Sequence, residues 1–186
     1  MNEIEVKILS IDKAAILARL ASLAWPRVKN EHQVNTIYDF PDLRLLAKKG
    51  YARIREVVDR DSGEAKTFMT VKTMISQEKY KIMEENETRI EDAKAGHGLF
   101  VSLGLKVRKT LIKDRISYRF EDALIEIDDV AQKEYPFPLL EIETTNPQTL
   151  HRILEFLDFQ EEDTTSLTMT EILARHSQEV ARHDRL

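Results

Sequence analysis

The chain has 186 residues, of which 42% are hydrophobic and 33% charged, so it is long enough for one globular domain with a substantial apolar core. It contains no cysteine, which excludes disulfides, thiolate metal ligands and a cysteine nucleophile. The formal net charge of −5 argues against broad nucleic-acid binding, because such binding usually depends on a basic surface.

Two features of the sequence bear on location. The N-terminus has no basic and apolar leader, and no apolar run approaches the roughly 20 residues that a helix needs to cross a bilayer. We therefore expect a cytoplasmic protein, with a single domain over residues 1–186 and neither a nucleic-acid nor a membrane partner. A homodimer is compatible with the sequence.

The first predicted element is a strand over residues 3–7, in which charged and aliphatic side chains alternate. Successive side chains of a strand point to opposite faces, so Glu3, Glu5 and Lys7 share one face. Side chains two apart lie roughly 7 Å from each other, close enough for both carboxylates to ligate one or two hard cations. The alternative is an edge strand whose charged face is simply solvated.

The next elements combine a packing helix with further strands. Asp12 is positioned to cap a helix that extends to about Leu23. Residues 33–39 predict a strand, and residues 41–46 predict a short helical turn. Residues 51–55 and 67–72 then predict a hairpin. The basic positions on this hairpin are Arg53, Arg55 and Lys72.

The second half of the chain repeats the alternation, with paired charges on each strand. These strands are predicted at residues 79–89, 107–120, 124–128 and 139–143. In the same order, the pairs are Glu85 and Glu87, Lys113 and Arg115, Glu126 and Asp128, and Glu141 and Glu143. Helices are predicted at residues 92–103, from Asn146 as N-cap through Leu157, and from Ser166 as N-cap through about Ala181.

Eight predicted strands joined by turns favour an antiparallel sheet, and closure into a barrel removes its unpaired edges. The alternation predicts charged side chains in the lumen and apolar side chains outside, under the helices. A solvated outer face would give the same alternation. It does not explain why acids and bases occur on different strands, so we favour the charged lumen.

A lumen with both carboxylate pairs and cationic pairs suits a polyphosphate bound with divalent metals. Carboxylates are ligands for Mg²⁺ or Mn²⁺, and arginine and lysine neutralise phosphoryl oxygens. Together they would stabilise the charge that develops during phosphoryl transfer.

Several motifs in order along the chain resemble the CYTH superfamily, also called triphosphate tunnel metalloenzymes. They are Glu3-x-Glu5-x-Lys7, Thr36-Ile37-Tyr38-Asp39, residues 41–46 followed by Gly50-Tyr51-Ala52-Arg53-Ile54-Arg55, Lys113-x-Arg115 and Glu141-x-Glu143. The resemblance extends from residue 3 to about residue 173. It implies an α+β fold with an eight-stranded antiparallel tunnel, a divalent-metal requirement, and a triphosphate substrate. That substrate would be tripolyphosphate, thiamine triphosphate, or ATP in the class IV adenylyl cyclases.

The resemblance also implies roles for the lumen residues. The implied metal ligands are Glu3, Glu5, Glu126, Asp128, Glu141 and Glu143. The implied triphosphate contacts are Lys7, Arg53, Arg55, Lys72, Lys113 and Arg115, with Glu85 and Glu87 lining the same region. Glu5, Lys7 and Lys72 are the implied catalytic residues. Ile37 departs from the family pattern, which commonly has an aromatic residue there, so ring stacking is not expected at that position.

Three functions fit these observations. The first is a metal-dependent triphosphatase with water as the nucleophile. The second is an adenylyl cyclase, in which the ribose 3′-hydroxyl of ATP attacks the α-phosphorus. The third is a non-catalytic polyphosphate-binding module, which the four acidic pairs argue against, because acids repel an anionic ligand. The histidines lack ligand spacing, and the chain has no Walker-type glycine loop.

Overall fold

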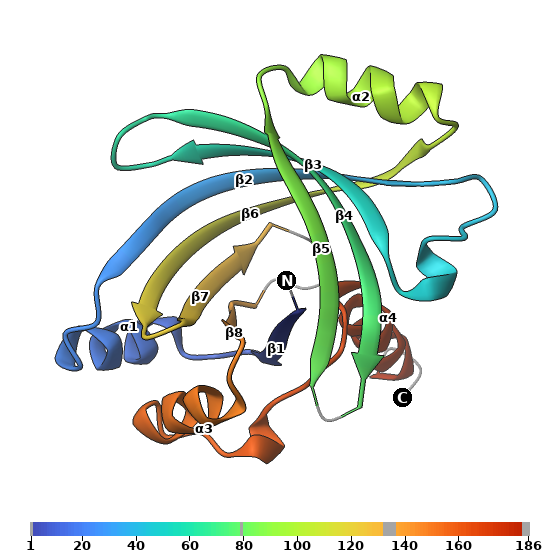
Figure 1. Ribbon diagram of the computed structural model, residues 1–186. Coiled ribbons are helices and arrows are strands. Elements are labelled where there is room, and N and C mark those ends of the chain that lie inside the picture. The colour runs from blue at the N-terminus through green and yellow to red at the C-terminus, as the bar shows by residue number, and fades with distance from the viewer. Residues whose placement is uncertain (1, 79, 132–136, 184–186) are drawn as a thin grey trace.

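The computed structural model describes residues 2–78, 80–131 and 137–183, which form a closed antiparallel β-barrel with helices packed against it (Figure 1). The strand order around the barrel is β1-β5-β4-β3-β2-β6-β7-β8. The strands are β1 (Asn2–Ile8), β2 (Arg27–Asp39), β3 (Tyr51–Asp59), β4 (Ala65–Gln77), β5 (Lys81–Ile90), β6 (Lys106–Phe120), β7 (Ala123–Val130) and β8 (Leu139–Thr144). The α-helices of the described part are α1 (Lys13–Ser22), α2 (Ala93–Ser102), α3 (Pro147–Phe156) and α4 (Met169–His183). The predicted eight-stranded α+β barrel is confirmed.

The main apolar core lies outside the barrel, between its wall and two helices. The aliphatic residues of β1, β7 and β8 alternate with charged ones and pack under α1 and α3. The buried members of this core are Val6, Ile8, Ile11, Ile16, Leu20, Ala123, Ile125, Ile127, Leu140, Ile142, Leu150, Ile153, Leu154 and Leu157. Because strand side chains alternate between faces, the charged residues between these aliphatics must point into the lumen.

Helix α2 covers the outer face of β2, β3 and β4. Its Phe100 packs with Tyr38, Ala52 and Ile54, and the Tyr38 hydroxyl lies 3.0 Å from His97 Nδ1. Gly96 permits the close approach of this helix, because a Cβ atom there would lie 2.6 Å from Ile90 Cδ1. The helix thus buries an apolar outer surface and leaves the lumen face of these strands polar.

Helix α4 packs against the end of the barrel at which β4 finishes and β8 starts. Ile172 is 2% exposed and forms an apolar cluster with Leu139, the first residue of β8. Gln77, the last residue of β4, donates to Glu171 at 2.9 Å, and Lys49 pairs with the same carboxylate at 3.0 Å. These contacts hold the helix over that end of the barrel.

Two predicted local features are wrong. Thr168, not Ser166, caps α4: Glu171 accepts from the Thr168 amide at 2.8 Å and donates its own amide to Thr168 Oγ1 at 3.3 Å. The helical turn predicted at residues 41–46 is instead a series of turns before a short 3-10 helix, η1 (Leu46–Lys48). Leu43 has a φ of 59°, in the left-handed region, which no right-handed helix can include.

Element boundaries otherwise follow the predictions, with longer strands. β2 begins at Arg27 instead of residue 33, directly after the Pro26 that ends the α1 segment. Asp12 and Asn146 cap α1 and α3 as expected, accepting from Ala15 and Gln148. Lys79, at the predicted start of β5, lies outside the described residues. Among the helices of the described ranges, none has both the length and the apolar character of a membrane-spanning segment.

Substitution of Glu171 by glutamine is expected to destabilise the protein at neutral pH but not in acid. Although burial opposes it, the hydrogen bonds from Gln77 and Thr168 lower the pKa of Glu171 to about 2. A depressed folded-state pKa stabilises the protein above the unfolded value of about 4.5, and this contribution disappears as the pH falls toward 2. Since the side chain stays 33% exposed, we expect a loss of only about 1 kcal/mol at pH 7, or roughly 2–4 °C in melting temperature.

Melting curves of the parent, Glu171→Gln and Glu155→Gln between pH 7 and pH 2.5 measure this effect. Glu155 is exposed on α3, so its substitution should change little at any pH. A Glu171→Gln difference that persists undiminished at pH 2.5 would contradict the proposed ionic anchoring of α4.

Candidate functional site

Every strand of the barrel contributes at least one charged side chain to the lumen. The buried ones among them are Glu5, Lys7, Lys72, Lys81, Arg115, Glu126, Asp128 and Glu141. Charged residues are rarely buried to this degree unless they are paired. The structure therefore brings together nearly all the predicted site residues, with the acids on β1, β7 and β8 and many of the bases on β3, β4 and β6.

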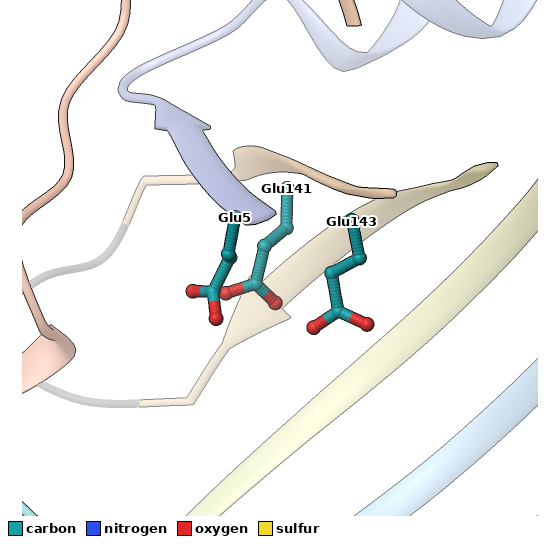
Figure 2. Close-up of side chains that lie close together, drawn as sticks. All are labelled: Glu5, Glu141 and Glu143. Atoms are coloured by element: carbon teal, nitrogen blue, oxygen red, sulfur yellow. The ribbon is translucent and has the colours of Figure 1, made fainter. Parts of the chain in front are cut away.

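Three carboxylates from two adjacent strands form an acidic cluster, which we define as Glu5, Glu141 and Glu143. One carboxylate oxygen of each lies within 4.8 Å of those of the other two. The antiparallel register of β1 and β8 causes this, because it places Glu5 opposite Glu143 and Lys7 opposite Glu141. In Figure 2 the three side chains extend from β1 and β8 in the same direction, with the carboxylates of Glu5 and Glu141 side by side.

The acidic cluster has the donor set that a hard divalent cation requires. Mg²⁺ and Mn²⁺ prefer carboxylate oxygens, and three such groups at mutual distances under 4.8 Å can converge on one ion. In the described structure, the cluster is neutralised by lysines instead: Lys7 contacts Glu5 and lies 2.5 Å from Glu141, and Lys81 contacts Glu5. These residues therefore fit a divalent metal, provided that the lysines change partners.

Arg115 is the centre of a second, wholly buried network. Its Nε lies 2.6 Å from Asp128 and its Nη2 lies 2.5 Å from Glu141, while Nη1 contacts Glu126. Although burial opposes it, the attraction of Asp128 and Glu141 raises the pKa of Arg115 above its usual value. The same pairing lowers the pKa of Asp128 against the effect of burial. Arg115 and Asp128 are accordingly charged at neutral pH.

The third network joins β3, β4 and β5. Arg55 pairs with Glu87 at 2.9 Å, Lys72 pairs with Glu85 at 2.7 Å, and Arg53 lies 3.4 Å from both carboxylates. The Nε groups of Arg53 and Arg55 are buried and have no hydrogen-bond partner among the described residues. Each arginine thus keeps one donor for an acceptor that the described chain does not supply.

For two of the lumen lysines, the effect of burial on the pKa outweighs the attraction of the neighbouring acids. Burial lowers the pKa of Lys7 to about 7, against the attraction of Glu141. Burial and the neighbouring Arg115 also lower the pKa of Lys113, which lies 2.6 Å from Asp128. Additional negative charge in the lumen would offset the cost of burying these ammonium groups.

The ion pairs of the lumen can exchange partners in a definite way. Without a ligand, each buried acid is balanced by a base of this chain. A metal would take the place of the bases at the acidic cluster, and an anion would take the place of the acids around the released cations. A lumen of this kind is therefore suited to a ligand that brings a divalent cation and a polyanion together.

The structure also adds lumen residues that the sequence did not single out. They are Lys29, Gln33, Asn35, Tyr51 and Lys81. Lys81 and Tyr51 lie in predicted strands at the same parity as Glu85 and Arg53, so the alternation alone could have identified them. Lys29, which lies 3.5 Å from Glu126, falls in the part of β2 that was not predicted. The side chain of Glu3 lies outside the described part of the structure, so its predicted role remains a prediction.

A comparison with protein-family models matches residues 1–167 to the CYTH domain. The chain has no match among curated proteins. The matched range includes all eight strands and every lumen residue described above.

Similar solved structures have low sequence identity and nearly complete coverage. The PH1819 protein of Pyrococcus horikoshii has a TM-score of 0.77 at 24% identity, with 93% of this chain and 98% of that chain covered. An adenylate cyclase candidate from Vibrio parahaemolyticus has a TM-score of 0.72 at 18% identity, with 92% of this chain and 97% of that chain covered. The Hippeastrum protein HpAC1, described as an adenylyl cyclase candidate with a dominant triphosphatase activity, has a TM-score of 0.69 at 20% identity, covering 93% and 95%. At these identities the likeness establishes the fold.

Proposed function

The chain belongs to the CYTH family, and from that premise we propose that it hydrolyses a small triphosphate in a divalent-metal-dependent reaction inside the barrel. The observation that carries this proposal is the placement of the acidic cluster and of the partly buried Arg53 and Arg55 on different walls. β8 lies opposite β3 in the closed strand order, so Glu141 and Glu143 face the wall that carries Arg53 and Arg55.

The arginines supply the substrate side of the proposed site. A phosphoryl oxygen is an ionised acceptor, and the unpartnered Nε groups of Arg53 and Arg55 are matching donors. Lys72 on the neighbouring strand extends this basic surface, and Lys113 and Arg115 provide cations on β6. We propose that these groups hold the triphosphate in line along the lumen and stabilise the charge that develops during phosphoryl transfer.

The acidic cluster supplies the metal side. Glu5, Glu141 and Glu143 would hold Mg²⁺ or Mn²⁺, with Glu3 as a further predicted ligand. When bound, the ion would neutralise phosphoryl charge. Glu126 and Asp128, also predicted ligands, contact Arg115 in the structure, so we propose that they chiefly hold that guanidinium in position. Glu85 and Glu87 would do the same for Arg53, Arg55 and Lys72.

We propose Glu5, Lys7 and Lys72 as the residues with the greatest effect on turnover. Glu5 belongs to the acidic cluster, and Lys7 contacts two of its members. Lys72 is buried and, although burial opposes it, the attraction of Tyr51, Glu143 and Glu85 raises its pKa, so it stays charged beside the substrate. Hydrolysis needs only water as nucleophile, and the described activity of HpAC1 supports testing it first.

A release assay separates this proposal from its alternatives. Purified protein with Mg²⁺ or Mn²⁺ is given tripolyphosphate, thiamine triphosphate or ATP, and phosphate, pyrophosphate and cyclic AMP are measured. Phosphate release without cyclic AMP supports the triphosphatase. Pyrophosphate with equimolar cyclic AMP from ATP would make the protein a class IV adenylyl cyclase, and binding without any product would make it a polyphosphate-binding module.

Turnover is expected to require a divalent metal. With a chelator in excess, activity should fall to background, because the lumen carboxylates would then face an anionic substrate without a cation between them. Addition of Mg²⁺ or Mn²⁺ beyond the chelator should restore it. Full turnover in excess chelator would rule out the metal role assigned to the acidic cluster.

A further inference from the structure

β2 presents two neutral carboxamides, Gln33 and Asn35, to a lumen that is otherwise lined largely by ionised groups. Gln33 is 0% exposed and Asn35 is 4% exposed. They share a face of the strand because they are two residues apart. β2 lies opposite β1 in the closed strand order, so this amide pair occupies the wall across from Glu5.

Both carboxamides carry a buried acceptor without a donor. Gln33 Oε1 and Asn35 Oδ1 are solvent-inaccessible and make no hydrogen bond to the described residues. The orientation of Gln33 is fixed, since its Nε2 donates to Glu31 at 2.6 Å. A buried carbonyl oxygen normally has a partner, so two such unpartnered oxygens on one face indicate a donor that the described residues do not provide.

The chemistry of this missing donor differs from that of a phosphoryl group. Ionised phosphoryl oxygens only accept hydrogen bonds, so they match the arginine Nε groups and cannot satisfy the two carbonyl oxygens. Asn35 lies directly opposite Arg55 in the register of β2 and β3, with Cβ atoms about 5 Å apart. The donor therefore belongs to a group immediately beside the phosphoryl group that Arg55 would hold.

We propose that Gln33 and Asn35 determine specificity by accepting hydrogen bonds from a hydroxyl group of an esterified triphosphate. This inference rests on the proposed function of the lumen and goes beyond it by naming the substrate class. Fully ionised tripolyphosphate has no such donor. A nucleoside triphosphate has two, the ribose 2′- and 3′-hydroxyls, and it is the probe that tests the inference.

The test is equilibrium binding of four probes, each with Mg²⁺: ATP, 2′-deoxy-ATP, 3′-deoxy-ATP and tripolyphosphate. In the parent protein, removal of the recognised hydroxyl should weaken binding about fivefold to tenfold. Asn35→Leu and Gln33→Met keep the size of the side chain but remove the acceptor, so they should weaken the binding of ATP by a similar factor. The affinities for the analogue that lacks the recognised hydroxyl and for tripolyphosphate should stay within about twofold of the parent values. The matched control is Asn86→Leu, on the exposed outer face of β5, which should change no affinity.

The outcomes separate this inference from the proposed function. Tripolyphosphate binding without ATP binding, or equal affinity for ATP and both deoxy analogues, would overturn the inference and leave a triphosphate site. If the variants lost affinity equally for all four probes, the two carboxamides would serve only to pack the lumen, and the inference would be overturned. Binding of no probe would overturn both. The comparison within the parent protein stands even if a variant fails to fold.

Discussion

Replacement of Arg115 by methionine is expected to lower the free energy of unfolding by about 3–5 kcal/mol. The guanidinium is 5% exposed and contacts Glu126, Asp128 and Glu141, all buried. Methionine fills a similar space without charge, so the variant would bury three carboxylates without the cation that they share. Urea unfolding at pH 7 measures the loss.

The control for this prediction is Arg119→Met on the same strand. Arg119 is exposed near the end of β6, so its substitution should change the free energy of unfolding by no more than about 0.5 kcal/mol. The Arg115→Met deficit should also shrink in acid, because protonation removes the uncompensated negative charge. Equal losses in the two variants, or a deficit independent of pH, would mean that Arg115 acts through packing alone.

The alternation of charged and aliphatic residues was sufficient to predict the barrel and which side chains line its lumen. Alternation assigns Glu5 and Lys7 to one face and Val6 and Ile8 to the other without any structure. It does not say which face is inside. The placement of paired acids and paired bases on different strands decided that point correctly. In the structure, the buried residues Leu150, Ile153, Leu154 and Leu157 supply the complementary apolar surface.

The grouping of the lumen charges could not be predicted, because it depends on register. Four acidic pairs look equivalent in the sequence. The pairing of β1 with β8 brings Glu5 to Glu143, whereas the pairing of β6 with β7 places Asp128 opposite Arg115. The pairing of β1 with β8 joins residues more than 130 positions apart, which no local pattern encodes.

Two other features, the N-cap of α4 and the amide pair of β2, were not predicted although the sequence contains a signal for each. Thr168-x-x-Glu171 is a capping-box pattern, and Ser166 has no acid three residues later. Gln33 and Asn35 lie in a predicted strand at alternate positions, but a neutral amide attracts no notice in a search for charge. The structure singles them out because no donor among the described residues reaches their oxygens.

Glu5→Gln is expected to lower turnover of the best triphosphate by a factor of at least about 10², with the fold intact. Glu5 is 5% exposed, belongs to the acidic cluster and contacts Lys7 and Lys81. Glutamine keeps the shape and removes the charge, so it would weaken a ligand for the proposed metal, which would stabilise the transition state. Circular dichroism and steady-state kinetics measure fold and turnover. The control is Glu84→Gln, exposed on the outer face of β5, which should keep normal turnover.

Arg53→Ala should impair triphosphate binding instead of the metal response. The contrast with Glu5→Gln tests the assignment of one barrel wall to the triphosphate and the other to the metal. Loss of one charge-assisted contact should weaken triphosphate binding by about ten- to a hundredfold, with the metal dependence little altered. In melting experiments with metal, tripolyphosphate or both, Arg53→Ala should keep the response to metal and lose much of the response to triphosphate. Glu5→Gln should lose the response to metal and, with it, the additional shift that metal and triphosphate produce together. If both variants kept the ligand shifts of the parent protein, neither residue would contact the ligand, and the lumen charges would serve only to balance one another.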